Sequence, residues 1–87
     1  MGKKHQSTFA AITKKPDCKD IDWNDFISLL NYLGATIKNQ SGSSVGVRLN
    51  SVYAVFHRPH PERHIYVSDL KRIRRFLMEA GINEVEK

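Results

Sequence analysis

The segment that most constrains the fold is Gly42–Pro61, which reads GSSVGVRLNSVYAVFHRPHP. It contains two runs in which apolar residues alternate with other residues, as they do in half-buried β-strands. Asn50-Ser51 separates the runs, and asparagine tolerates the positive φ angle that a two-residue hairpin turn requires. Pro59 and Pro61 cannot donate to a sheet ladder, so the second strand must end before them. The segment therefore predicts a β-hairpin followed by a stiffened loop.

A further strand is predicted before the hairpin, with Ile37 facing the core and Lys38 facing solvent. Small residues at Ser41–Ser44 predict the turn that joins it to the hairpin. The three predicted strands are Ala35–Gln40, Val45–Leu49 and Val52–Phe56. Together they predict an antiparallel meander.

Two amphipathic helices are predicted on either side of the meander, because apolar residues recur at spacings of three and four. Asp20 or Asp22 can cap the first helix, and Gly34 ends it. Ser68 is expected to cap the second helix, and Gly81 ends it. The two apolar stripes are Trp23, Phe26, Leu29, Leu30 and Leu33, and Leu70, Ile73, Phe76, Leu77 and Ala80. At this spacing the aromatic members are predicted to be core residues rather than a stacking platform.

A short additional helix is predicted at Gln6–Lys14, with Phe9, Ile12 and Thr13 on one side, whereas Met1–His5 is expected to be frayed. The sequence is consistent both with packing of this helix on the rest of the chain and with a role in assembly.

The order of elements predicts an α+β sandwich that resembles the double-stranded-RNA-binding fold, α-β-β-β-α, with an extra N-terminal helix. Both main helices would cover one sheet face and leave the other exposed to water. We therefore divide the chain into an N-terminal extension, residues 1–19, and one domain, residues 20–87.

Charge and composition narrow the classes of partner. The formal net charge is +5 and the sequence pI is about 9.6, which favours a polyanion or an acidic protein as partner. Cys18 is the single cysteine, so an internal disulfide and a multi-cysteine zinc site are excluded. No apolar run approaches the length of a membrane span, and the start lacks the apolar core of a signal peptide. We expect a cytoplasmic protein with no membrane partner.

Several segments resemble the HicA family. They are the helix end Leu33-Gly34, the turn Gly42-Ser43, the segment HRPHP, and the last helix, SDLKRIRRFLMEAGI. The resemblance covers about residues 20–82. It implies a small toxin of a bacterial toxin–antitoxin pair that cleaves messenger RNA, with a cognate HicB-like antitoxin protein as its partner.

The chain departs from the family pattern at one position that matters. The pattern has a histidine directly after Gly-Ser, and that imidazole is taken as catalytic; here the position is Ser44. A serine hydroxyl does not titrate near neutral pH, so it cannot serve as the usual acid or base. Either another histidine has taken over catalysis, or the chain binds RNA without cutting it.

Histidines of the HRPHP segment are the candidates for catalysis. When the 2′-hydroxyl of RNA attacks the neighbouring phosphate, the enzyme supplies a base, an acid and positive charge. Histidine suits the first two roles because its unperturbed pKa is about 6.5. His60 occupies the Pro-His step shared with the family and is the first candidate, and His57 is the second. The prolines prevent a helix that would align His57, His60 and His64 as metal ligands, so no metal or other cofactor is expected.

Cations and small turn residues are the candidates for binding the RNA backbone, through charge and through hydroxyl and N–H donors. They are Lys38, Gly42, Ser43, Ser44, Arg48, Arg58, Lys71, Arg74 and Arg75. Two other functions fit the same features. One is a non-catalytic RNA-binding module, and the other is a protein-interaction domain whose basic face meets an acidic partner.

Overall fold

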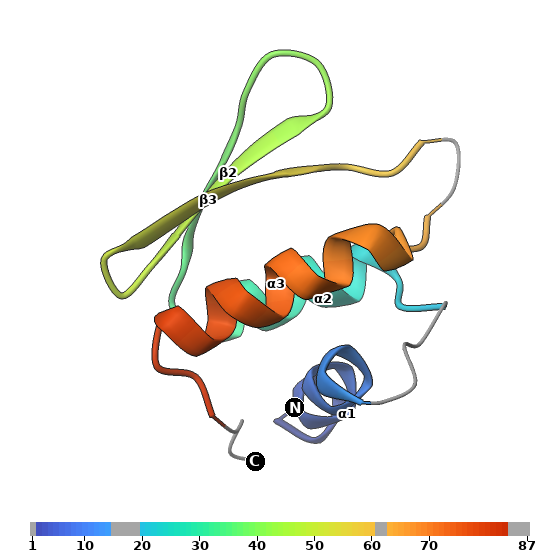
Figure 1. Ribbon diagram of the computed structural model, residues 1–87, viewed down its shortest axis with the longest axis vertical. Coiled ribbons are helices and arrows are strands. Elements are labelled where there is room, and N and C mark those ends of the chain that lie inside the picture. Colours follow the sequence, from blue (N-terminus) through green and yellow to red (C-terminus); the bar gives the residue numbers. More distant parts are fainter. Residues whose placement is uncertain (1, 15–19, 61–62, 84–87) are drawn as a thin grey trace.

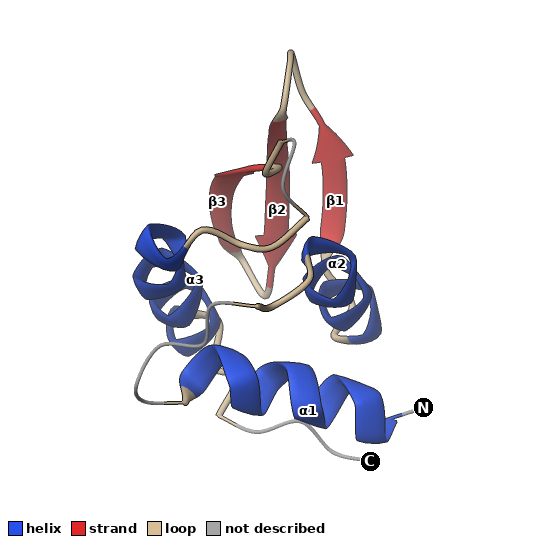
Figure 2. Ribbon diagram, turned by 90° about the vertical axis from the view of Figure 1, so that its right-hand side faces the viewer, coloured by secondary structure: helices blue, strands red, loops and turns tan. Residues whose placement is uncertain are grey.

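The computed structural model describes residues 2–14, 20–60 and 63–83. In chain order the elements are α1 (Gly2–Thr13), α2 (Trp23–Tyr32), β1 (Thr36–Asn39), β2 (Ser44–Leu49), β3 (Val52–His57) and α3 (Val67–Glu79). The strands form one antiparallel sheet in the order β1-β2-β3. Helices α2 and α3 cover one face of this sheet, and α1 lies on their far side (Figures 1 and 2). The predicted α+β arrangement, including the extra N-terminal helix, is confirmed.

The register of the hairpin follows from its two-residue turn. Asn50 and Ser51 have φ angles of 49° and 75°, which confirms the predicted turn between β2 and β3. The turn also contacts a helix, because Nδ2 of Asn50 donates a hydrogen bond of 2.9 Å to the carbonyl of Ala80. From this turn the strands pair outward as far as Ser44 opposite His57. The sheet is therefore anchored to the end of α3 and has one defined register.

Aromatic rings link the sheet to both covering helices. Phe56 of β3 makes edge-to-face contacts with Phe26 of α2, at 5.8 Å between ring centroids, and with Phe76 of α3, at 5.6 Å. Trp23 extends the row through Phe26 at 5.5 Å. Edge-to-face packing is a favoured geometry for aromatic pairs and adds to the burial of apolar area. The prediction that the aromatic residues of the two helices are core residues is confirmed.

Helices α2 and α3 both end at a glycine, as the sequence predicts. Gly34 and Gly81 have φ angles of 90° and 82°, a region that is strained for residues with a Cβ atom. In each helix the residue after the glycine donates its N–H to the carbonyl five residues earlier, at 3.0 and 2.9 Å. At the start of α2, Asp22 is the N-cap and its carboxylate accepts the N–H of Asn24 at 2.7 Å.

The prediction that Ser68 caps α3 is wrong, because the helix begins one residue before it. The N-cap is Tyr66, whose backbone is extended and which makes no side-chain capping bond. The segment that leads into α3 is held against the segment before α2, where Ile65 donates its N–H to the carbonyl of Ile21 at 2.8 Å. The chain is held in this contact just before the helix begins at Val67, and Ser68 is the second residue of the helix.

The prediction that Met1–His5 is frayed is wrong for residues 2–5, because α1 already begins at Gly2, and Met1 lies outside the described residues. The imidazole of His5 stacks on the ring of Tyr32 in α2, at 4.5 Å between centroids. The Lys4 ammonium lies 3.3 Å from a carboxylate oxygen of Asp25. These contacts hold the first turns of α1 onto α2.

Arg74 holds the other end of α1. The sequence makes it a candidate for binding the RNA backbone, but the residue is half-buried. Its Nε donates to the carbonyl of Ile12 at 2.6 Å, and its Nη2 donates to the carbonyl of Lys14 at 3.3 Å. A helix leaves its last carbonyls without partners, and a cation is favourable there. The side chain of Ile12 is fully buried, so Arg74 and the core together dock α1.

Replacing Arg74 by alanine is therefore expected to lower the free energy of unfolding by about 1–3 kcal/mol, because carbonyls near the end of α1 lose a charged donor. Arg75 is the matched control. It is exposed and lies 3.1 Å from Glu79 one helical turn away, a pair worth about 0.5 kcal/mol or less. Urea denaturation of both variants measures the difference. Equal midpoints for Arg74→Ala and Arg75→Ala would contradict the capping role.

Candidate nucleic-acid interface

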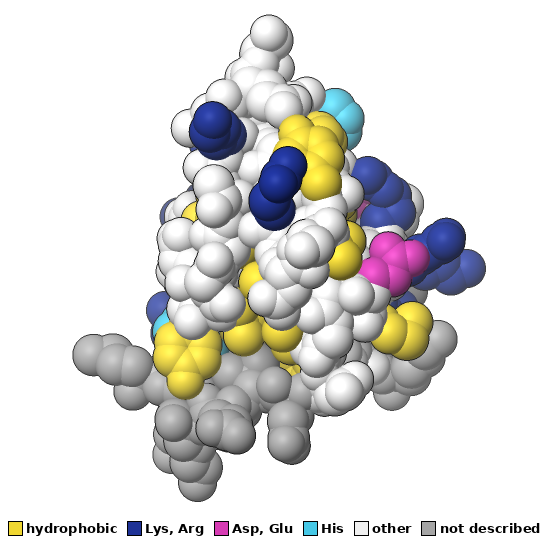
Figure 3. Space-filling view, turned by 90° about the vertical axis from the view of Figure 1, so that its left-hand side faces the viewer, with side chains coloured by type: hydrophobic (Ala, Val, Ile, Leu, Met, Phe, Trp, Pro, Cys, Tyr) yellow, Lys and Arg dark blue, Asp and Glu magenta, His cyan; other side chains and the backbone are white. Residues whose placement is uncertain are grey.

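The sheet face opposite the helices carries alternate residues of each strand. From β1 to β3 these residues are Thr36, Lys38, Gln40, Ser44, Gly46, Arg48, Tyr53, Val55 and His57. We call this set the outer face. All of its members lie in the described part of the chain, and none carries a carboxylate. Figure 3 shows basic side chains on this side of the molecule beside a hydrophobic patch and a histidine. The outer face is therefore cationic at neutral pH.

The pairing of β2 with β3 brings His57 and Ser44 together. His57 ends β3, Ser44 begins β2, and the two are directly opposite each other. The Cβ atoms of such pairs are about 4.5–5.5 Å apart. The sequence predicts Ser44 in the turn, whereas the structure includes it in the strand, which makes this pairing possible. An exposed imidazole thus lies beside the position at which the HicA pattern has its histidine.

His60 lies outside the outer face. It follows the buried Pro59 in the segment that connects β3 to α3, and its side chain is exposed. Its backbone N–H donates a hydrogen bond of 3.3 Å to the hydroxyl of Tyr66. Pro61, the second proline of the predicted stiff segment, lies outside the described residues. Within those residues, no group of three or more His, Cys, Asp or Glu side chains is placed to hold a metal ion.

The turn between β1 and β2 lies at the same end of the sheet as His57. Gly42 has a φ angle of 65°, which suits glycine in a tight turn. The carbonyl of Ser43 accepts the N–H of Arg58 at 2.8 Å, so the turn is joined to the chain just after β3. Gly42, Ser43 and Ser44 are therefore close to one another and to His57, as a shared site would require.

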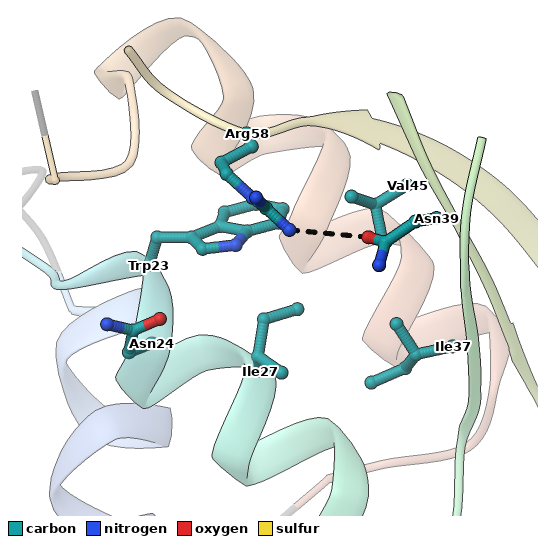
Figure 4. Close-up of a pocket in the computed structure, with 7 residues that line it drawn as sticks. All are labelled: Trp23, Asn24, Ile27, Ile37, Asn39, Val45 and Arg58. Atoms are coloured by element: carbon teal, nitrogen blue, oxygen red, sulfur yellow. Dashed lines mark hydrogen bonds between the residues drawn. The ribbon is translucent and has the colours of Figure 1, made fainter. Parts of the chain in front are cut away.

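Arg58 points toward the helices rather than over the outer face. Its guanidinium lies near the ring of Trp23, and its Nη2 is 3.3 Å from Oδ1 of Asn39 (Figure 4). These residues line a cavity of about 360 Å³ between α2 and the edge strand β1. Arg58 is exposed, so it adds positive charge at the edge of the sheet.

The cations of α3 do not form one surface. Lys71 is exposed, and Arg75 is exposed but bonded to Glu79. Arg72, which is not among the predicted site residues, donates a hydrogen bond of 2.7 Å to the carbonyl of Val55 on β3. With Arg74 directed at α1, the basic run of this helix is divided among several structural contacts. Of the three predicted candidates in this run, Lys71 and Arg75 are exposed and Arg74 is half-buried.

Tyr53 is an aromatic member of the outer face that is not among the predicted site residues. The residue is 53% exposed, and its hydroxyl oxygen accepts a hydrogen bond of 2.8 Å from Nε2 of Gln40. A Cβ atom added to Gly46 would lie 2.6 Å from that hydroxyl oxygen. The sequence signal for this residue is a tyrosine that faces outward from one strand, with a glycine at the diagonal position of the neighbouring strand.

Comparison with known proteins agrees with this architecture. Residues 23–82 match the family model described as HicA toxin of bacterial toxin-antitoxin. The match begins with α2 and ends just after α3, so it includes the whole sheet. No significant match was found among curated proteins or among solved structures. None of the described helices is long and apolar enough to cross a membrane. Because the family model covers well over half of the sequence, the chain belongs to the HicA toxins of bacterial toxin–antitoxin systems.

Proposed function

We propose that this toxin is an endoribonuclease that cleaves messenger RNA without a metal ion, and that a HicB-like antitoxin protein neutralises it in the cytoplasm. Membership of the HicA family supports the proposal. The observation that carries it is the cross-strand pair of Ser44 and His57. This pair supplies an imidazole at the corner of the sheet where the family pattern has its histidine.

In this proposal His57 is the general base. It takes the proton of a 2′-hydroxyl, whose oxygen attacks the adjacent phosphorus, while the 5′-oxygen of the next nucleotide leaves and takes up a proton from a general acid. The products are a 2′,3′-cyclic phosphate and a 5′-hydroxyl. His60, three residues further along the chain, is our candidate for that acid. The hydroxyl of Ser44 is suited to donate to a non-bridging phosphate oxygen.

Positive charge and backbone donors complete the proposed site. Lys38 and Arg48 lie on the outer face with His57, and Arg58 lies at the edge of the sheet. Gly42 and Ser43 contribute the small turn next to Ser44. Lys71 and Arg75 are more distant contacts for the RNA backbone. Such contacts stabilise the bound phosphates and need no base sequence.

The proposal is tested by incubating antitoxin-free toxin with RNA in excess EDTA. We expect cleavage that leaves cyclic phosphate and 5′-hydroxyl ends, detected by end-labelling of the fragments. An all-2′-deoxy strand of the same sequence is the control, and it should stay intact because it lacks the nucleophile. Cleavage of the deoxy strand, or cleavage abolished by EDTA, would rule out the proposed chemistry.

The presence of Ser44 in the usual histidine position favours a second function, a non-catalytic RNA-binding module. Such a protein would bind RNA with an affinity that falls as salt rises, and it would cut none. Intact RNA that is nevertheless bound in the same assay would support this alternative. A protein that neither binds nor cuts RNA would point instead to a domain that binds only an acidic protein.

A further inference from the structure

The ring of Tyr53 lies along the outer face of the sheet instead of projecting from it. A Cβ atom at Gly46 would point straight out of the sheet, and it would meet the Tyr53 hydroxyl oxygen at 2.6 Å and the ring atom Cζ at 3.3 Å. The far end of the ring therefore covers Gly46, which is buried in consequence. The hydrogen bond from Gln40, which follows β1, holds the hydroxyl over the central strand β2. The residue is 53% exposed, so a flat aromatic surface is presented to solvent.

The surroundings of this ring favour a polyanion. Arg48 is the direct cross-strand neighbour of Tyr53, and Lys38 is that of Gly46, which lies under the ring. His57 is on the same strand and the same face as Tyr53, roughly 13 Å further along at about 3.3 Å per residue. No member of the outer face is acidic, and the Glu79 carboxylate, which lines a pocket with Tyr53 beside this face, is bonded to Arg75. A ligand that crosses this face thus meets an aromatic ring, two cations and an imidazole.

We propose that Tyr53 is the platform on which the toxin stacks an unpaired nucleobase of its RNA substrate. Stacking on an aromatic side chain requires a base whose face is free, and it tolerates any base because each has a π-face. In a duplex the bases already stack on one another, and side chains reach mainly the backbone. The substrate class is therefore single-stranded RNA, or RNA with unpaired bases. The ring is a positioning residue that directs the neighbouring backbone toward His57. This inference rests on the proposed function.

The Tyr53 ring can lie flat on the sheet because Gly46 beneath it has no side chain. In Gly46→Ala the new methyl group occupies the space of the Tyr53 hydroxyl, so the ring must rise from the sheet. The displaced atoms are the end of a side chain, and the strand pairing is retained. The variant therefore disturbs the platform while the ring stays in the protein.

The test measures affinity for a 2′-O-methyl oligonucleotide, which cannot be cleaved by the 2′-hydroxyl route, and for the same backbone without bases. We expect Tyr53→Leu to weaken binding of the base-containing strand by about ten- to a hundredfold. Tyr53→Phe, which keeps the ring, should lose far less. The matched control is Tyr32→Leu, because Tyr32 is similarly exposed, at 43%, but lies on α2. All variants should bind the abasic strand equally.

The outcomes separate this inference from the proposed function. Equal affinity of wild type and Tyr53→Leu for the base-containing strand would overturn the platform even if RNA is still cleaved. If Tyr53→Leu lost affinity equally for the base-containing and the abasic strand, the platform would also be overturned, because the ring would then contribute to binding without contacting a base. Tighter binding of duplex than of single strand by the wild type would contradict the substrate class. A wild-type protein that neither binds nor cuts RNA would reject the proposed function itself.

Discussion

Replacing Phe56 by alanine is expected to lower the free energy of unfolding by about 3–5 kcal/mol. The side chain is 1% exposed and joins the sheet to both covering helices through Phe26 and Phe76. The guanidinium of Arg72 also lies over its ring, 5.2 Å from the centroid. Domains are typically stable by only about 5–15 kcal/mol, and a small domain has little in reserve. We therefore expect the variant to be largely unfolded at moderate urea concentrations.

The single tryptophan, Trp23, belongs to the same aromatic row and gives a fluorescence signal for this unfolding. Met78→Ala is the control, because that side chain is 67% exposed and exposed substitutions usually change stability by about 0.5 kcal/mol or less. A Phe56→Ala protein with the urea midpoint of Met78→Ala would mean that the aromatic row does not hold the layers together.

Replacing His57 by alanine is expected to reduce RNA cleavage by about 10²- to 10⁴-fold, the usual contribution of a general base. The fold should be unaffected, because the side chain is exposed at the end of β3. RNA affinity should change little by comparison, so the loss should appear in the rate at saturating RNA. The measurement is single-turnover cleavage of a labelled RNA, with the melting temperature of each variant recorded alongside.

Two further variants make this test specific. His64→Ala removes another exposed histidine, whose backbone bridges Asp22, and it should cleave at the wild-type rate. In the double variant Ser44→His with His57→Ala, an imidazole returns to the opposite member of the cross-strand pair, and we expect cleavage to recover in part. Full activity of His57→Ala, together with loss of activity in His60→Ala, would assign the base to His60 instead.

Most of the fold could be predicted because its signals are local. The alternation of apolar and polar residues in a strand indicates which of its faces is buried. A glycine directly after the last apolar residue of an amphipathic helix indicates where the helix ends. The pairing of Ser44 with His57 was also implicit in the sequence, since counting outward from the turn at Asn50-Ser51 leads to it. The small residues around Ser44 predict a turn there instead, so this pairing is missed, and His60 is the first candidate because it occupies the Pro-His step shared with the family.

The features that could not be predicted depend on contacts between distant segments. Arg74 belongs to a basic run that is typical of a solvated helix face, yet it bonds to carbonyls near the end of α1. Ser68 has the usual composition of a cap, but the helix begins before it, just after the contact of Ile65 with Ile21. The orientation of Tyr53 depends on Gly46 and Gln40, which belong to other parts of the sheet. No local pattern specifies such contacts.

The hydrogen bond from Arg72 to the carbonyl of Val55 has a consequence for self-association. β3 is an edge strand, and an edge presents unpaired N–H and C=O groups to which a strand of another molecule can add. Arg72 occupies one of these carbonyls in the middle of β3 and places a positive charge beside the edge. A strand from a second copy of the protein that paired with β3 would have to displace the Arg72 guanidinium. It would also bring the cations of the second copy close to those of the first. We therefore expect this contact from the basic helix to make the β3 edge a poor place for a further strand to add.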